Sequence, residues 1–186
     1  MAGQVVRTPD SEVPDVGNGL WERVQDAVAA ESGADKSLWN GKINYTDPER
    51  RIRGSATAGG TLKLNQDVVV RPLQEMYATR GQPATEQQWI ERRNALKTVG
   101  HEFTHLTAPE HHDHDDRLAD MRQPEYKPIE EGITEAWSQA ALDDLADRSL
   151  PPDLGRAGEG GPWAPVLPGL GTGGPLVRRR DRGRGR

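Results

Sequence analysis

The five histidines of the chain all lie in the segment VGHEFTHLTAPEHHDHDD, residues 99–116. His101 and His105 are four residues apart, so on a helix both imidazoles project from one face and can bind the same metal ion. Glu102 lies between them in sequence, where its carboxylate is placed to take a proton from water rather than to bind the metal. The chain has no cysteine, so a zinc ion would have to use histidine and carboxylate ligands. This spacing predicts a hydrolytic metal site with Glu102 as general base.

A catalytic zinc ion usually has three protein ligands and one open position, so a third ligand must come from elsewhere. One candidate is His111, because residues 101–111 nearly match HExxHxxGxxH, the metzincin pattern, with Met121 as a possible Met-turn. The mismatch falls on the glycine, whose position is taken by Ala108. Because Ala108 precedes a proline, it is restricted to extended conformations, which disfavours the sharp turn that the glycine allows. The other candidate is Glu131, in the segment EEGITE.

The motifs HEFTH and EEGITE together resemble those of the gluzincins, the thermolysin-like clan of zinc metallopeptidases. In that clan HExxH is completed by a glutamate on a downstream helix, and an acidic residue follows four residues later. The resemblance implies that Glu131 is the third zinc ligand and that Glu135 accepts a hydrogen bond from a zinc-binding histidine, with His101 favoured. It also implies cleavage of a protein or peptide substrate, by an endopeptidase more than an exopeptidase. Larger gluzincins use a His or Tyr to stabilise the oxyanion, and Tyr126 is a candidate here.

The elements that must position these residues can be predicted from apolar periodicity. Apolar residues at three- and four-residue spacing predict a helix over 19–31, capped by Asn18, and Pro72 can start a short helix that ends near Gly81. Thr85 and Gln88 form a capping box for a helix over 86–107, which carries the histidine motif on its last turns. After a polar loop over 109–127, a last helix is predicted over 128–150, with an apolar stripe that begins at Ile129 and Ile133.

Residues 38–70 change to the pattern of strands. The segments LWNGKINY, RIRGSAT and TLKLNQDVVV are separated by turn signals and predict two or three antiparallel strands. In TLKLN, residues 61–65, Leu62 and Leu64 alternate with polar residues, as in a half-buried strand. In gluzincins the strand before the motif helix is an edge strand that binds an extended peptide, and the resemblance gives TLKLN that position.

The predicted fold class is α+β, with a small antiparallel sheet, helices packed on one side of it, a zincin-like arrangement and disordered termini. Residues 1–17 are expected to be flexible, 18–150 to form the metallopeptidase domain, and 151–186 to be a Gly/Pro/Arg-rich, disordered tail.

Charge and hydropathy limit the class of partner. The chain of 186 residues carries a net charge of −5, although RRRDRGRGR at 178–186 is basic. An acidic body with a short basic tail argues against dedicated nucleic-acid binding. No apolar run is long enough for a membrane span and no signal peptide is recognisable, so a cytoplasmic protein without membrane contact is expected.

Two further interpretations stay open at this point. The chain could be a zinc-stabilised, non-catalytic domain that binds a partner protein, or a peptidase under a regulatory or inhibitory partner. The His/Asp-rich run at 111–116 is expected to be a hydrated loop, with a weak second ion site or a lid over the cleft as alternatives.

Overall fold

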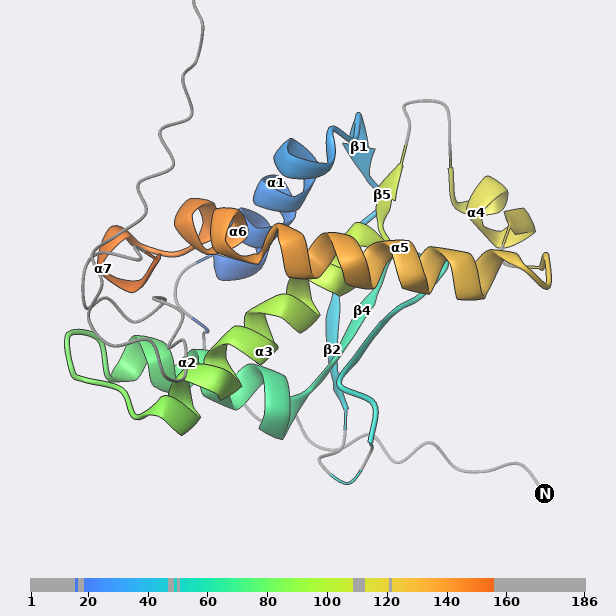
Figure 1. The fold of residues 1–186 in the computed structure, drawn as a ribbon. Coiled ribbons are helices and arrows are strands. Elements are labelled where there is room, and N and C mark those ends of the chain that lie inside the picture. Colours follow the sequence, from blue (N-terminus) through green and yellow to red (C-terminus); the bar gives the residue numbers. More distant parts are fainter. Residues whose placement is uncertain are drawn as a thin grey trace, which may run out of the picture.

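A computed structural model describes residues 16, 19–46, 49, 51–108, 113–120 and 122–155. Helices dominate this part, and a three-stranded sheet lies beside them (Figure 1). The helices are α1 (Leu20–Ser32), the π-helical turn η1 (Gln66–Val70), α2 (Arg71–Ala78), α3 (Glu86–Thr104), α4 (His114–Asp120), α5 (Tyr126–Ala140), α6 (Leu142–Ser149) and α7 (Pro152–Gly155). The strands are β1 (Lys36–Ser37), β2 (Ile43–Thr46), β3 (Gly54–Ala56), β4 (Leu62–Asn65) and β5 (Thr107–Ala108). The mixed α+β class predicted from the sequence is confirmed.

The sheet has the order β2-β4-β3, and its pairing differs from the prediction. β3 and β4 form an antiparallel pair, whereas β2 runs parallel to β4, with Ile43 opposite Leu62. The prediction of an antiparallel sheet was therefore wrong for β2, because the segment between β2 and β3 reverses the chain before β4 enters between them. β4 is the central strand, so the expectation that TLKLN forms an edge was also wrong, and β2 and β3 are the two edge strands.

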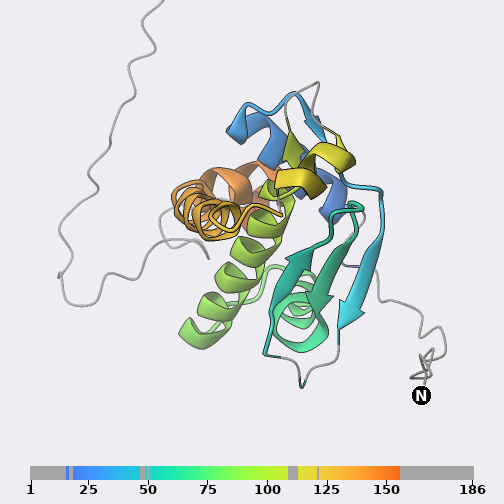
Figure 2. The ribbon, with the colours of Figure 1, turned by 90° about the vertical axis from the view of Figure 1, so that its right-hand side faces the viewer.

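One face of the sheet packs against the helices. Leu62 and Leu64 of β4 are fully buried, while Lys63 between them is exposed, which confirms the predicted alternation at these positions. Asn65, which was expected to face outward, is buried instead. Figure 2 shows the sheet on one side of the molecule, with α3 and α5 on the other side.

The segment after β4 was predicted as strand but is helical. The side chain of Asn65 accepts hydrogen bonds from the backbone N–H groups of Asp67 and Val68, which caps the turn of η1. η1 continues directly into α2, where Pro72 lies in the first turn as predicted. A run of β-branched residues favours a strand by propensity, but the capping asparagine and the following proline favour a helix start.

α3 forms the centre of the fold. Its predicted capping box is present: the Thr85 side chain accepts from the Gln88 backbone N–H, and the Gln88 side chain accepts from the Thr85 backbone N–H. The helix ends at Thr104, three residues before the predicted end, because Thr107 and Ala108 pair with β1. Phe103 is buried and makes an edge-to-face contact with Trp39, with the ring centroids 5.2 Å apart.

The apolar core gathers around α3 from α1, α2, β4 and α6. The predicted stripe of α1 is buried at Leu20, Val24, Ala27 and Val28. Val16 and Leu154, which lie just outside the predicted domain boundaries, also belong to the core.

The predicted last helix is two helices, α5 and α6, which meet at Ala141. Of its predicted apolar stripe, Ala141 and Leu145 are buried, and Trp137 of α5 is partly buried against the core. Ile129 and Ile133 are 60% and 65% exposed, so the expectation that they face the core was wrong. The face of α5 that packs on α3 carries small polar residues, Thr134 and Ser138, both buried.

The polar segment predicted as a loop over 109–127 contains α4. The Asp113 side chain caps this helix: its Oδ1 atom accepts from the backbone N–H groups of Asp115 and Asp116, at 2.8 and 3.0 Å. His114 Nδ1 lies 2.6 Å from the carbonyl oxygen of Ala58. Part of the His/Asp-rich run therefore has a structural role. His111, His112 and the Asn18 cap lie outside the described residues, as do most of the two predicted flexible ends. Among the described helices none combines the length and apolar character needed to cross a bilayer.

Candidate metal centre

The two histidines of the motif meet at the end of α3. His105 is the residue after the helix, yet its backbone stays helical (φ −60°, ψ −20°) and its N–H bonds to the carbonyl oxygen of His101 at 3.3 Å. The i, i+4 spacing is therefore preserved, and the imidazoles face each other with Nε2 atoms 3.1 Å apart. Both side chains are mostly buried, at 15% and 7% exposure.

Glu131 of α5 completes a group of three. Its Oε2 atom lies 3.3 Å from His101 Nε2 and 3.6 Å from His105 Nε2. A tetrahedral ion with bonds of about 2.0–2.1 Å holds its ligand atoms about 3.3–3.4 Å apart. The three observed separations lie around this value, so the donor atoms already have the spacing of one metal site.

The other ring nitrogens face carboxylates. His101 Nδ1 lies 3.4 Å from Glu135 Oε2, and His105 Nδ1 lies 3.0 Å from Glu130 Oε1. Neither buried Nδ1 atom has a well-aligned hydrogen bond, so the carboxylates are within reach rather than ideally oriented. A proton on each Nδ1 would leave both Nε2 lone pairs directed at the same point.

Further contacts fix these carboxylates. Lys97 of α3 donates to Glu135 Oε1 at 2.5 Å and ties α3 to α5, and Gln139 donates to the same oxygen at 2.6 Å. These two hydrogen bonds lower the pKa of Glu135, so its carboxylate stays ionised.

The two imidazoles differ in their titration. Burial, followed by the neighbouring His105, lowers the pKa of His101. Burial also acts to lower the pKa of His105, but the Glu130 carboxylate 3.0 Å from its Nδ1 atom, with the charges of Glu102 and Glu131, outweighs it, so the pKa of His105 is raised. Of the two, His105 is therefore the ring that holds a proton more strongly.

Glu102 is buried, at 6% exposure, and faces β3 instead of joining the three ligands. A Cβ atom placed on Gly54 of β3 would lie 2.8 Å from Glu102 Cγ and Oε1. Any side chain at position 54 would therefore force this carboxylate to move.

Two hollows open on either side of the group, with volumes of about 170 and 390 Å³. Gly54, Glu102 and Glu131 line both of them. Because they share these residues, the two hollows adjoin as one groove between β3 and α5, with His105 lining the smaller hollow and His101 the larger one. Lys127 lines the smaller hollow and Lys97 the larger one.

The structure thus brings together His101, His105, Glu131, Glu102 and Glu135, all of which were named from the sequence. Tyr126, the predicted oxyanion stabiliser, begins α5 and is not among the residues that line the two hollows. The alternative ligand His111 and its partner Met121 lie outside the described residues.

Sequence reasoning missed three residues of the site. Glu130 had a weak signal, as an extra carboxylate beside a predicted ligand, and Lys97 had one as a cation four residues before His101 on the same helix. The role of Gly54 depends on contact between β3 and α3, for which the sequence carries no signal.

Comparison of the chain with protein-family models, curated protein sequences and solved structures found no match.

Proposed function

We propose that this protein is a zinc-dependent metallopeptidase with a zincin-like core of the gluzincin type. The observation that carries the proposal is the spacing of 3.1, 3.3 and 3.6 Å among two imidazole nitrogens and one carboxylate oxygen. Two histidines and a glutamate form the ligand set of several catalytic zinc sites. The same donor types also suit iron, so metal analysis is part of the test.

A bound zinc ion supplies Lewis acidity, which polarises a carbonyl group and makes water nucleophilic near neutral pH. Glu102 then acts as general base: it takes the water proton and passes it to the leaving nitrogen. Its burial beside the ligands, without being one of them, supports this role. Glu135 and Glu130 orient the two imidazoles through their Nδ1 atoms.

The edge strand β3 supports an extended peptide as the substrate. The Arg53 carbonyl oxygen accepts from the Asn65 N–H of β4, and the Thr57 N–H donates to the carbonyl oxygen of Thr61, the residue before β4. By the alternation of an antiparallel pair, Gly54 and Ala56 direct their N–H and C=O groups away from β4, toward the groove. An extended chain could pair with these groups and pass over the metal centre. β3 therefore takes the role that the sequence assigned to TLKLN.

We propose that Lys127 stabilises the negative charge of the oxyanion. Its side chain lines the same hollow as Glu102 and His105, whereas Tyr126 does not.

The test combines metal analysis with a peptide-cleavage assay. Wild-type protein should hold one zinc ion per chain, and Glu131→Ala should lose it, because one of three ligands is removed. Glu125→Ala, at an exposed glutamate six residues earlier, is the matched control and should keep the metal. Glu102→Gln should keep zinc while its turnover falls by about 10²–10⁴-fold.

Two outcomes would contradict the proposal. Full zinc content in Glu131→Ala would show that the ligand set is wrong, and the metzincin-like alternative would then be tested by His111→Ala. Stoichiometric zinc with no cleavage by the wild type, and no effect of Glu102→Gln, would indicate a zinc-stabilised binding domain instead.

A further inference from the structure

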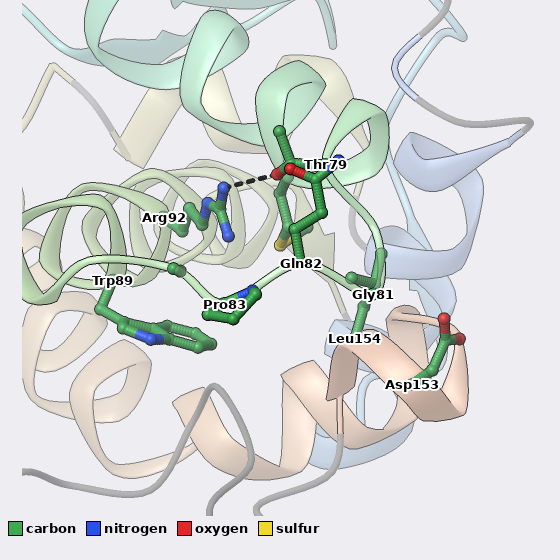
Figure 3. Close-up of a pocket in the computed structure, with 10 residues that line it drawn as sticks. Thr79, Gly81, Gln82, Pro83, Trp89, Arg92, Asp153 and Leu154 are labelled. Carbon is green, nitrogen blue, oxygen red and sulfur yellow. Dashed lines mark hydrogen bonds between the residues drawn. The ribbon is translucent and has the colours of Figure 1, made fainter.

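A second cavity, of about 360 Å³, lies at the opposite end of α3 from the histidines. It is bounded by the turn between α2 and α3, the first turns of α3, and α7 (Figure 3). Arg92, which lines it, precedes His101 by nine residues, about 14 Å along a helix. None of its lining residues lines the groove at the metal centre. This cavity is therefore separate from the candidate active site.

Arg92 is buried in the wall of this cavity, with only 5% exposure. Its one hydrogen bond within the described part of the chain runs from Nη2 to Thr79 Oγ1, at 2.9 Å. No carboxylate of the described residues lies within ion-pair distance of it, although the more distant Glu75 acts on it electrostatically. A guanidinium has five N–H donors, so most of the hydrogen-bonding capacity of Arg92 is unused.

The unused donors open to the cavity. Among the described residues, two side-chain nitrogens have neither access to solvent nor a hydrogen-bond partner, Nδ1 of His101 and Nδ1 of His105. No nitrogen of Arg92 is in this state. The nitrogens of Arg92 that do not bond to Thr79 are therefore not sealed away from solvent, and Arg92 lines the cavity. Burial lowers the pKa of Arg92, and the charge of Glu75 opposes this only in part, as expected of a cation whose charge is not fully compensated.

The rest of the wall is apolar or neutral. Trp89 and Pro83 lie beside the arginine, and Leu154 of α7 lies across the cavity, as Figure 3 shows. The other charged group is Asp153, at the rim, and it is neutralised by an ion pair with Arg80. The wall thus offers one positive charge, offset only in part by Glu75, beside an aromatic and aliphatic surface.

We propose that this cavity binds a small monocarboxylate with an aromatic or apolar body. The carboxylate would accept two N–H groups from Arg92, a geometry that a guanidinium matches well. The body would pack on Trp89 and Leu154. The volume lies at the lower end of the range for small-molecule pockets, about 300–1,000 Å³. One free positive charge favours a monoanion over a doubly charged phosphate.

The test titrates the full-length wild-type protein with 3-phenylpropionate and with its uncharged amide, and follows tryptophan fluorescence and calorimetric heat. The acid should bind at least tenfold more tightly than the amide, and inorganic phosphate should bind more weakly than the acid. Equal binding of acid and amide would overturn the proposal, and this comparison does not depend on any variant folding. Phosphate binding without phenylpropionate binding would overturn it as well.

Variants locate the site. Arg92→Gln should weaken the acid at least tenfold and leave the amide unchanged, whereas Arg93→Gln should bind as wild type, because Arg93 pairs with Asp143 outside the cavity. Trp89→Phe should remove the fluorescence change while the heat of binding remains. Undiminished binding to Arg92→Gln, with normal circular dichroism, would contradict the assignment. None of these measurements uses peptidase activity, so the result is independent of the proposed function.

Discussion

The contact between Gly54 and Glu102 gives the sharpest test of how the carboxylate of the proposed general base is positioned. In Gly54→Ala the new Cβ atom would lie 2.8 Å from Glu102 Cγ and Oε1, where an ordinary contact needs 3.4 Å or more. The carboxylate must then retreat by about 0.6 Å. The backbone of Gly54 has a negative-φ strand conformation, so alanine adds no backbone strain and the effect is steric.

The displacement should act on turnover and leave the metal in place. A shift of about 1 Å at a reacting group can cost about 100-fold in rate, so we expect kcat of Gly54→Ala to fall by about 10–100-fold. Zinc content should equal that of the wild type, since the three atoms nearest to the added Cβ atom all belong to Glu102 and none to His101, His105 or Glu131. The assay is cleavage of a quenched fluorescent peptide, with zinc measured on the same sample.

Gly132→Ala is the matched control, because a Cβ atom at this position meets nothing within 4 Å. This variant should keep full activity and gain about 0.8–1.0 kcal/mol of unfolding free energy, as alanine is the better helix former. Unchanged kcat in Gly54→Ala, or loss of zinc together with activity, would refute the argument that β3 positions Glu102.

Three further predictions follow from the packing around the site. Glu130→Gln removes the carboxylate that raises the pKa of His105, so protons compete less with the metal and the acid limb of the zinc-binding profile should move to lower pH. Zinc affinity at pH 8 should still fall by about 10–100-fold, because the His105 ring loses its orienting partner. An acid limb that moves to higher pH would contradict this assignment. Asn65→Ala removes the cap of η1 and should lower the unfolding free energy by about 1–2 kcal/mol in urea, whereas no change would mean that water replaces the cap. Gly100→Ala would place a Cβ atom 2.8 Å from Leu145 Cδ1, so its unfolding free energy should be about 1–3 kcal/mol lower than that of Gly132→Ala, which has the same helix-propensity gain without the contact. The double variant with Leu145→Val should partly remove this difference.

The parts of the site that the sequence predicts are those fixed by local geometry. The spacing of His101 and His105 follows from the helix period, and the capping box at Thr85 fixes where that helix begins. Glu131 could be named because its motif resembles that of a known clan. In each case a few neighbouring residues carry the whole signal.

Other features depend on contacts between distant segments. The parallel pairing of β2 with β4 follows from the path of the chain between β2 and β3, which no periodicity encodes. The orientation of α5 was mispredicted because the isoleucine stripe suggests an inward apolar face. The helix instead directs its carboxylates toward the histidines of α3, which leaves Ile129 and Ile133 exposed.

The orientation of α5 also bears on how this helix stays in place. α5 packs mainly on α3 and α6, and the side it presents to α3 brings Glu130, Glu131 and Glu135 toward Glu102. Lys97 offsets only part of this crowding of like charge. A divalent cation bound among these side chains would hold α5 against α3. Metal binding and the docking of α5 would then be thermodynamically coupled, so that each stabilises the other.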